Sequence, residues 1–112
     1  MRLQPIVYVT DMDRALRWYA ALLGCEPVVR GGYWSSFALG DAQLALHLSD
    51  DAPVPGGVEL SLVVTEPLEA VIGRVTPVRG IADEAFGRSI VVADPDGTRI
   101  QVNEHDPELY DQ

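Results

Sequence analysis

Gln4-Pro5-Ile6-Val7-Tyr8-Val9-Thr10-Asp11 and Glu59-Leu60-Ser61-Leu62-Val63-Val64-Thr65-Glu66 are two stretches with one pattern. Each is a short run rich in β-forming residues that ends in threonine and an acid and leads into a helical pattern. They begin at residues 4 and 59, an offset of 55. A second similar pair begins at residues 44 and 100, an offset of 56: Leu44-Ala45-Leu46-His47 and Ile100-Gln101-Val102-Asn103. Repeats at nearly one offset predict two modules of about 55 residues.

A helix is predicted directly after the first stretch. Thr10 or Asp11 can cap its free N–H groups, and Gly24 provides a left-handed stop. Between them the apolar residues recur at helical spacing, at Met12, Ala15, Leu16, Tyr19, Leu22 and Leu23. Three strands are predicted next, at residues 26–30, 33–39 and 42–48, with glycine-containing turns between them. The first module therefore has the pattern βαβββ.

The second module has a shorter predicted helix that starts at Pro67 and carries Leu68, Val71 and Ile72. Strands are predicted near residues 75–81, at 89–93 and at 99–103, with a turn at Asp94-Pro95-Asp96-Gly97 before the last one. We predict a single domain, 1–112, built of modules 1–49 and 58–104. A linker at 50–57, rich in proline and glycine, joins them, and a polar tail follows at 105–112.

The chain is acidic, with a formal net charge of −9 from 17 acids and 8 bases. Such a chain repels phosphate backbones and anionic lipid, so we expect neither nucleic acid nor a membrane as a partner. Cationic small molecules are weakly favoured, although acidity also serves plain solubility. The single cysteine, Cys25, excludes an internal disulfide and a cysteine-rich zinc site. The first residues lack a long apolar run, and we expect a cytoplasmic protein.

Several motifs resemble those of the vicinal oxygen chelate superfamily. In the first module they are Asp11-Met12-Asp13-Arg14-Ala15, Trp18-Tyr19 and Leu23-Gly24; in the second they are Phe86-Gly87-Arg88, Asp94-Pro95-Asp96-Gly97 and Ile100-Gln101. That superfamily contains glyoxalase I, extradiol dioxygenases, fosfomycin-modifying enzymes and bleomycin resistance proteins. The resemblance implies an α+β fold of two tandem βαβββ modules. Their mixed sheets would curve around a cleft, with the helices on the outer faces, usually in a homodimer.

The resemblance also implies where a metal ion would bind. The superfamily's four ligand positions fall on Gln4, Ala45, Glu59 and Gln101. Only Glu59 is a strong ligand, because a divalent ion needs several carboxylate or imidazole groups to replace its water. We therefore predict a metal-free site and no cofactor. His47 could supply a ligand if the register were shifted, or it could face solvent or be hydrogen-bonded in the cleft. His105 is expected at the surface.

Strand alternation predicts which side chains face the cleft. The predicted ligand-binding residues are Tyr8, Trp34, His47, Glu59, Ser61, Gln101 and Asn103. They combine aromatic rings, neutral hydrogen-bonding groups and one carboxylate, which suits a flat, partly polar, cationic organic ligand. A packed core or interface position is an equal alternative for Trp34, since a slip of one residue reverses its face.

These features favour a small-molecule-binding protein of the glyoxalase and bleomycin resistance type. It would sequester a cationic aromatic antibiotic or metabolite and so confer antibiotic resistance. The alternative is an enzyme of the same superfamily. That enzyme would be a metal-dependent lyase or dioxygenase with an unusual ligand set, or a metal-independent isomerase with Glu59 as general base. A regulatory ligand sensor is a third class that shares the same sequence features.

Overall fold

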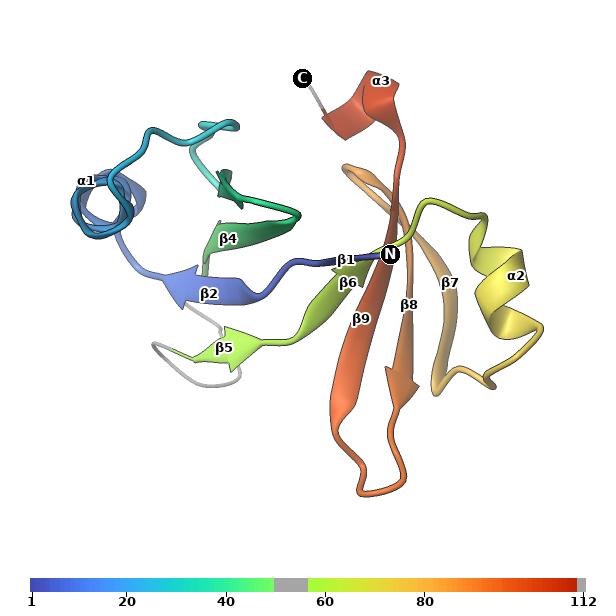
Figure 1. Ribbon diagram of the computed structural model, residues 1–112. Helices are drawn as coiled ribbons and strands as arrows, with labels where there is room; N and C mark the ends of the chain where they lie inside the picture. The colour runs from blue at the N-terminus through green and yellow to red at the C-terminus, as the bar shows by residue number, and fades with distance from the viewer. Residues whose placement is uncertain (50–56, 111–112) are drawn as a thin grey trace. The chain divides into compact units, whose positions relative to one another are not determined.

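The computed structural model describes residues 1–49 and 57–110, so the predicted linker lies outside the described residues except for Gly57. The fold is α+β with two mixed sheets (Figure 1). The four-stranded sheet has the order β3-β4-β2-β5, with β2 (Ile6–Val9), β3 (Trp34–Leu39), β4 (Ala42–Leu48) and β5 (Val58–Glu59). The five-stranded sheet has the order β1-β6-β9-β8-β7, with β1 (Arg2–Leu3), β6 (Ser61–Val63), β7 (Arg79–Glu84), β8 (Gly87–Ala93) and β9 (Arg99–His105). The helices are α1 (Met12–Leu23), α2 (Leu68–Ile72) and α3 (Pro107–Tyr110).

The chain divides into two compact units, one around each sheet. The four-stranded unit is Gln4–Glu59, and the five-stranded unit joins Met1–Leu3 to the residues from Leu60 onward. The predicted repeat is confirmed by their strand pairing. In one unit β2 pairs in parallel with β4, Ile6 opposite Ala45; in the other β6 pairs in parallel with β9, Ser61 opposite Gln101. These pairs are related by the same offsets as the repeated stretches.

The chain contributes strands to both sheets around each repeated stretch, where a single strand was predicted at each place. Arg2 and Leu3 form β1 and pair with β6, whereas β2 resumes at Ile6 in the other sheet and pairs with β5. Pro5 lies at this break, and proline has no N–H to donate to a ladder. Its carbonyl still accepts a hydrogen bond from the Ala45 N–H at 2.9 Å. The predicted strand that ran through Glu59 and Ser61 is likewise divided between β5 and β6.

Helix α1 begins and ends where the sequence predicts. Asp11 is its N-cap, and the side chain accepts a hydrogen bond from the Arg14 N–H at 3.0 Å. Gly24 ends the helix with φ of 69°, a left-handed conformation that favours glycine. The apolar stripe of α1 packs on one face of the four-stranded sheet, with a buried core of Met12, Leu16, Phe37 and Leu46. The opposite face of that sheet is therefore the one with polar side chains.

Three strand predictions need correction. Residues 26–30 form no strand but only a single bridge, Val29 to Ser36, because Pro27 interrupts the run of N–H donors. The strand predicted near residues 75–81 instead spans Arg79–Glu84, since the Val75 N–H bonds to the Val71 carbonyl and extends the end of α2. The last strand continues to His105, and α3 follows it, where a polar tail was predicted. Pro67 is the N-cap of α2 and not its first residue.

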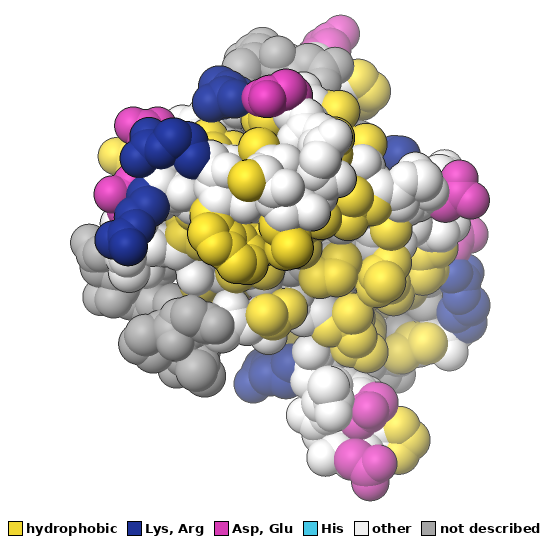
Figure 2. Space-filling model, turned by 60° about the vertical axis from the view of Figure 1, so that its left-hand side comes forward, with side chains coloured by type: hydrophobic (Ala, Val, Ile, Leu, Met, Phe, Trp, Pro, Cys, Tyr) yellow, Lys and Arg dark blue, Asp and Glu magenta, His cyan; other side chains and the backbone are white. Residues whose placement is uncertain are grey.

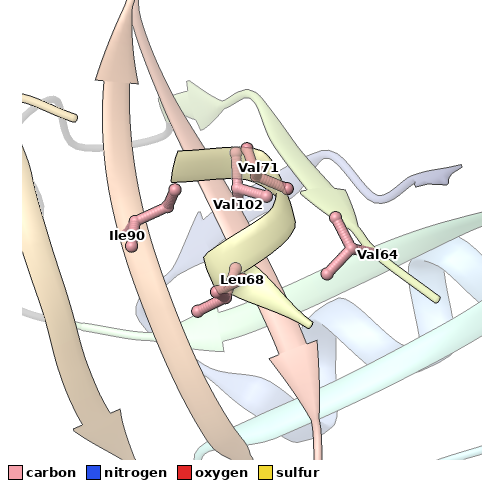
Figure 3. Close-up of a cluster of buried hydrophobic side chains, with 5 residues drawn as sticks. All are labelled: Val64, Leu68, Val71, Ile90 and Val102. Atoms are coloured by element: carbon pink, nitrogen blue, oxygen red, sulfur yellow. The ribbon is translucent and has the colours of Figure 1, made fainter. Parts of the chain in front are cut away.

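The core of the five-stranded unit lies between α2 and its sheet. Figure 3 shows the buried cluster that they form, Val64, Leu68, Val71, Ile90 and Val102. Pro67 provides no side-chain cap for α2, and Glu104 of β9 replaces it by accepting a hydrogen bond from the Leu68 N–H at 2.9 Å. Arg88 holds that carboxylate through two hydrogen bonds of 2.9 Å. These bonds keep the pKa of Glu104 below its usual range.

Large apolar side chains are also exposed, and the space-filling view shows hydrophobic side chains at the surface (Figure 2). On α1, Trp18 is 60% exposed. Leu22 was predicted in the core-facing stripe but is 63% exposed, so the helix side that faces away from the core is not purely polar. In the described parts of the chain, the helices all fall short of the length and hydropathy of a membrane span.

Replacing Glu104 tests its role as a cap supplied by a neighbouring strand. Glu104→Ala removes the acceptor of the Leu68 N–H and should lower the free energy of unfolding by about 1 kcal/mol or more. Glu104→Gln keeps an acceptor oxygen and should cost less. Urea denaturation of both variants measures the difference. Equal losses would show that the carboxylate acts only through its charge.

Candidate functional site

A row of aromatic side chains crosses the four-stranded sheet on the face opposite α1. Trp34 of β3 and Tyr8 of β2 are both the register partners of His47 on β4, so the three side chains lie on one face. The His47 ring meets Tyr8 edge to face, with centroids 5.5 Å apart at 74°, and meets Trp34 at 6.1 Å and 61°. All three are partly exposed. The row therefore presents partly exposed rings at steep angles to one another, and a flat ligand can stack on a ring face.

Glu59 stands at the Tyr8 end of the aromatic row. It comes from β5, whose partner is β2, and its carboxylate accepts a hydrogen bond from the Tyr8 hydroxyl. Burial, followed by this hydrogen bond and the negative charge of Glu59, raises the pKa of Tyr8 well above its usual range. The Tyr8 hydroxyl therefore stays protonated, and by donating its hydrogen bond it holds the Glu59 carboxylate in place. The arrangement combines π faces with an oriented negative charge.

The superfamily's metal positions do not form a ligand set in this chain. Gln4 is fully buried, and its Nε2 donates to Gln43 Oε1 at 2.6 Å. Ala45 has no side-chain donor atom, the Glu59 carboxylate accepts a hydrogen bond from the Tyr8 hydroxyl, and Gln101 offers only a neutral amide oxygen. Within residues 1–49 and 57–110, no three His, Cys, Asp or Glu side chains gather as a group that could hold a metal ion. One carboxylate with neutral companions does not fit a tightly bound divalent ion.

The other predicted site residues lie on the five-stranded sheet. Ser61 is the register partner of Gln101, and Asn103 donates from Nδ2 to Gln101 Oε1 at 3.3 Å. Ser61 and Asn103 are buried, whereas Gln101 is partly exposed. The structure thus groups the seven predicted residues as four on one sheet and three on the other.

His105, expected at the surface, is the last residue of β9 and is partly buried. Its ring meets Phe86 edge to face at 5.2 Å and 72°. Burial, with a smaller contribution from the charge of Arg2, lowers the pKa of His105 to about 4. The imidazole is therefore neutral at physiological pH.

Sequence reasoning did not identify Arg79, Ser89 and Glu84, which form a hydrogen-bonded chain on the five-stranded sheet. Arg79 Nη2 donates to Ser89 Oγ at 2.7 Å, and Ser89 Oγ donates to Glu84 Oε1 at 2.8 Å. Arg79 was within the strand predicted near residues 75–81, but Pro77 and Gly80 interrupt the side-chain pattern there. Ser89 was within a predicted strand, next to the apolar Ile90, and alternation alone would have placed it on the polar face.

No family model matches the sequence. A solved chain from Vibrio splendidus, described as a glyoxalase/bleomycin resistance protein/dioxygenase superfamily member, aligns with a TM-score of 0.61 at 18% identity. The alignment covers 92% of this chain and 97% of that one. The chain has the glyoxalase/bleomycin resistance/dioxygenase fold. The resemblance drawn from the sequence motifs is confirmed in its fold.

Other proteins are similar as well. A Legionella pneumophila chain described as an NAD-dependent benzaldehyde dehydrogenase aligns with a TM-score of 0.72 at 19% identity, over 93% of this chain and 99% of that one. A virulence protein of Salmonella typhimurium is 22% identical over an alignment of 116 residues, which covers 89% of this chain and 81% of the relative. At these identities the solved structures establish the glyoxalase/bleomycin resistance/dioxygenase fold and leave the ligand to be argued from the residues.

The depressed pKa of His105 predicts loss of stability in mild acid. Between pH 6.5 and about 4 the unfolded chain binds a proton at this ring while the folded chain does not. The stability contributed by the neutral ring is complete above about pH 6.5 and should fall by about 1–2 kcal/mol toward pH 4, after allowance for partial exposure. Urea denaturation across this range measures it. His105→Gln should show a shallower slope, and an unchanged slope would contradict the assignment.

Proposed function

We propose that this chain binds a small, flat organic cation on the Trp34–His47–Tyr8 row, without a metal ion. The observation that supports this most directly is the carboxylate of Glu59 at the end of the row, held by the Tyr8 hydroxyl. An aromatic cation stacked on such rings gains about 1–2 kcal/mol when it is partly desolvated. A charge-assisted hydrogen bond to Glu59 adds about 1.5–3 kcal/mol if it is buried and paired.

Sequestration of an antibiotic is the form of binding that we favour. The glyoxalase/bleomycin resistance/dioxygenase fold supports it, and so does the net charge of −9, which attracts cationic molecules at long range. Binding alone then suffices for protection, because the bound drug is withdrawn from its target. No reacting group is required beyond the aromatic row and the carboxylate.

An enzyme remains the second candidate because the Tyr8–Glu59 pair joins a proton donor to a proton acceptor. In a metal-independent isomerase, Glu59 would take a proton from one carbon of the substrate and return it to another. The Tyr8 hydroxyl would turn from Glu59, once that carboxyl is protonated, to the developing oxyanion. Glu59→Gln would then abolish turnover with little loss of substrate affinity. If the chain only sequesters its ligand, Glu59→Gln should lower the affinity for that ligand, and neither the wild type nor the variant should show turnover.

Titration of a planar acridinium dye and a bleomycin-like glycopeptide tests the binding proposal. Trp18→Phe leaves Trp34 as the only tryptophan, and its fluorescence should be quenched on binding. In that background Trp34→Ala, followed by the dye's own emission, should weaken binding about 5- to 30-fold. Glu59→Gln should weaken it about tenfold or more.

Asp41→Asn is the matched control for Glu59→Gln, since it removes the same charge from the same unit at the turn between β3 and β4. It should leave affinity within about twofold, because an exposed distant charge is largely screened. Micromolar binding that survives Trp34→Ala and Glu59→Gln unchanged would place the ligand elsewhere. Binding of neutral or anionic compounds alone would contradict a cationic ligand.

Metal analysis addresses the metal-free part of the proposal. Protein purified without chelator should carry no stoichiometric Zn, Ni, Fe or Mn, because three of the four superfamily ligand positions lack a charged donor. Elemental analysis by mass spectrometry gives the ratio directly. An ion near one per chain that is lost in Glu59→Ala would refute this and favour a metal-dependent enzyme.

A further inference from the structure

The five-stranded sheet has a polar face of its own, on the side opposite α2. Successive register pairs place Ala82, Ser89 and Asn103 in one row and Arg79, Val91 and Gln101 in the next. The residues between them on β8 and β9, Ile90 and Val102, belong to the core under α2. The polar face therefore lies entirely within the five-stranded unit, whereas the aromatic row belongs to the four-stranded unit.

Arg79 is held in one position on this face by neutral acceptors. Its Nη1 donates to the Gly80 carbonyl at 2.9 Å and its Nη2 to Ser89 Oγ at 2.7 Å. Among the described residues it forms no direct ion pair, and the nearest carboxylate in its hydrogen-bonded chain is Glu84, which accepts from the Ser89 hydroxyl at 2.8 Å. The register shifts by one residue between Arg79 and Ala82, and such bulges re-aim side chains and are frequent beside binding sites. The chain has a net charge of −9, yet this guanidinium is fixed in place and partly exposed, so it can pair with an anionic ligand.

Asn103 provides a hydrogen-bond acceptor on β9, which is separated from β7 by β8. Its side chain is 1% exposed, its Nδ2 donates to Gln101, and its Oδ1 accepts no hydrogen bond from any residue that the structure describes. Buried polar atoms are nearly always paired, so an open acceptor indicates a missing donor. Asn103 is the register partner of Ser89, which the Arg79 guanidinium contacts. Neighbouring strands are about 5 Å apart, so the guanidinium and Oδ1 lie within reach of one small molecule.

We propose that this face binds a small carboxylate that also carries a hydrogen-bond donor, such as a 2-hydroxy acid. The carboxylate pairs with the Arg79 guanidinium, whose planar fork matches its two oxygens. The ligand's hydroxyl or amide N–H donates to Asn103 Oδ1. The site selects for both groups at once, because an acid without the donor leaves Asn103 unpaired and an amide without the charge leaves Arg79 without an anion.

Three probes of similar size separate these requirements: lactate, which has both groups, acetate, which has only the carboxylate, and lactamide, which has only the donors. Backbone amide shifts of the 15N-labelled full chain report binding at residues 79, 89 and 103. Lactate should saturate in the millimolar range, at least fivefold more tightly than acetate, and lactamide should not saturate. Equal affinity for lactate and acetate would show that Asn103 binds only water, and this would overturn the proposal. Lactate binding that does not saturate would overturn it as well.

Variants assign the two contacts. Arg79→Gln should weaken lactate binding tenfold or more, while Arg99→Gln, an exposed arginine at the start of β9, should leave it unchanged. Asn103→Leu should reduce lactate to the affinity of acetate. If that buried change unfolds the protein, the lactate-to-acetate ratio of the wild-type chain still decides the role of the donor. Unchanged binding in Arg79→Gln would overturn the site.

The outcome is independent of the proposed aromatic-cation site. Arg79→Gln should leave quenching of Trp34 by the acridinium dye unchanged, and Trp34→Ala should leave the lactate titration unchanged, since the residues belong to different sheets. Failure of one titration therefore does not imply failure of the other. Loss of both in Arg79→Gln would show unfolding of the variant, which circular dichroism distinguishes, or else a shared site that contradicts the proposal.

Discussion

The alternation of side chains along paired strands is the constraint on which the rest of the structure depends. Once Ile6 is opposite Ala45 and Ser61 is opposite Gln101, every second residue of each sheet must face a helix and the others must face away. The helix-facing residues form two separate apolar cores, under α1 and under α2. The residues that face away include the aromatic row and the polar side chains of the other sheet, together with buried apolar residues such as Ile6 and Ala45. A shift of one residue in either pairing would exchange core and site.

This constraint explains why much of the fold and one site face were predictable. The bounds of α1 depend on local groups, Asp11 and Gly24, and those of β4 on a strict alternation, so both followed from the sequence. The strands predicted at residues 26–30 and 75–81 were wrong for equally local reasons. Pro27 removes a backbone N–H donor, and the Val75 N–H bonds to the end of α2. Alternation also placed Tyr8, Trp34 and His47 on one face without knowledge of the sheet order.

The contacts that give the sites their chemistry could not be predicted in the same way. Tyr8 and Glu59 are 51 residues apart, and they meet only because β5 crosses into the sheet of the first module. No periodicity within either stretch encodes that exchange. Arg79 reaches Ser89 through a one-residue bulge, which breaks the alternation by which a strand is recognised. Sequence patterns specify faces, whereas pairing between distant segments specifies partners.

The two proposed sites differ from what the net charge alone would predict. A value of −9 averages over the whole surface and favours cations at long range, but a ligand in contact experiences the groups within a few ångströms. On the four-stranded sheet the fixed charge beside the aromatic row is the Glu59 carboxylate. On the five-stranded sheet the Arg79 guanidinium is the fixed positive group, and the Glu84 carboxylate is bonded to the same Ser89 hydroxyl. At each proposed site, affinity would follow from the oriented group, while the net charge would set only how readily an anion or a cation approaches.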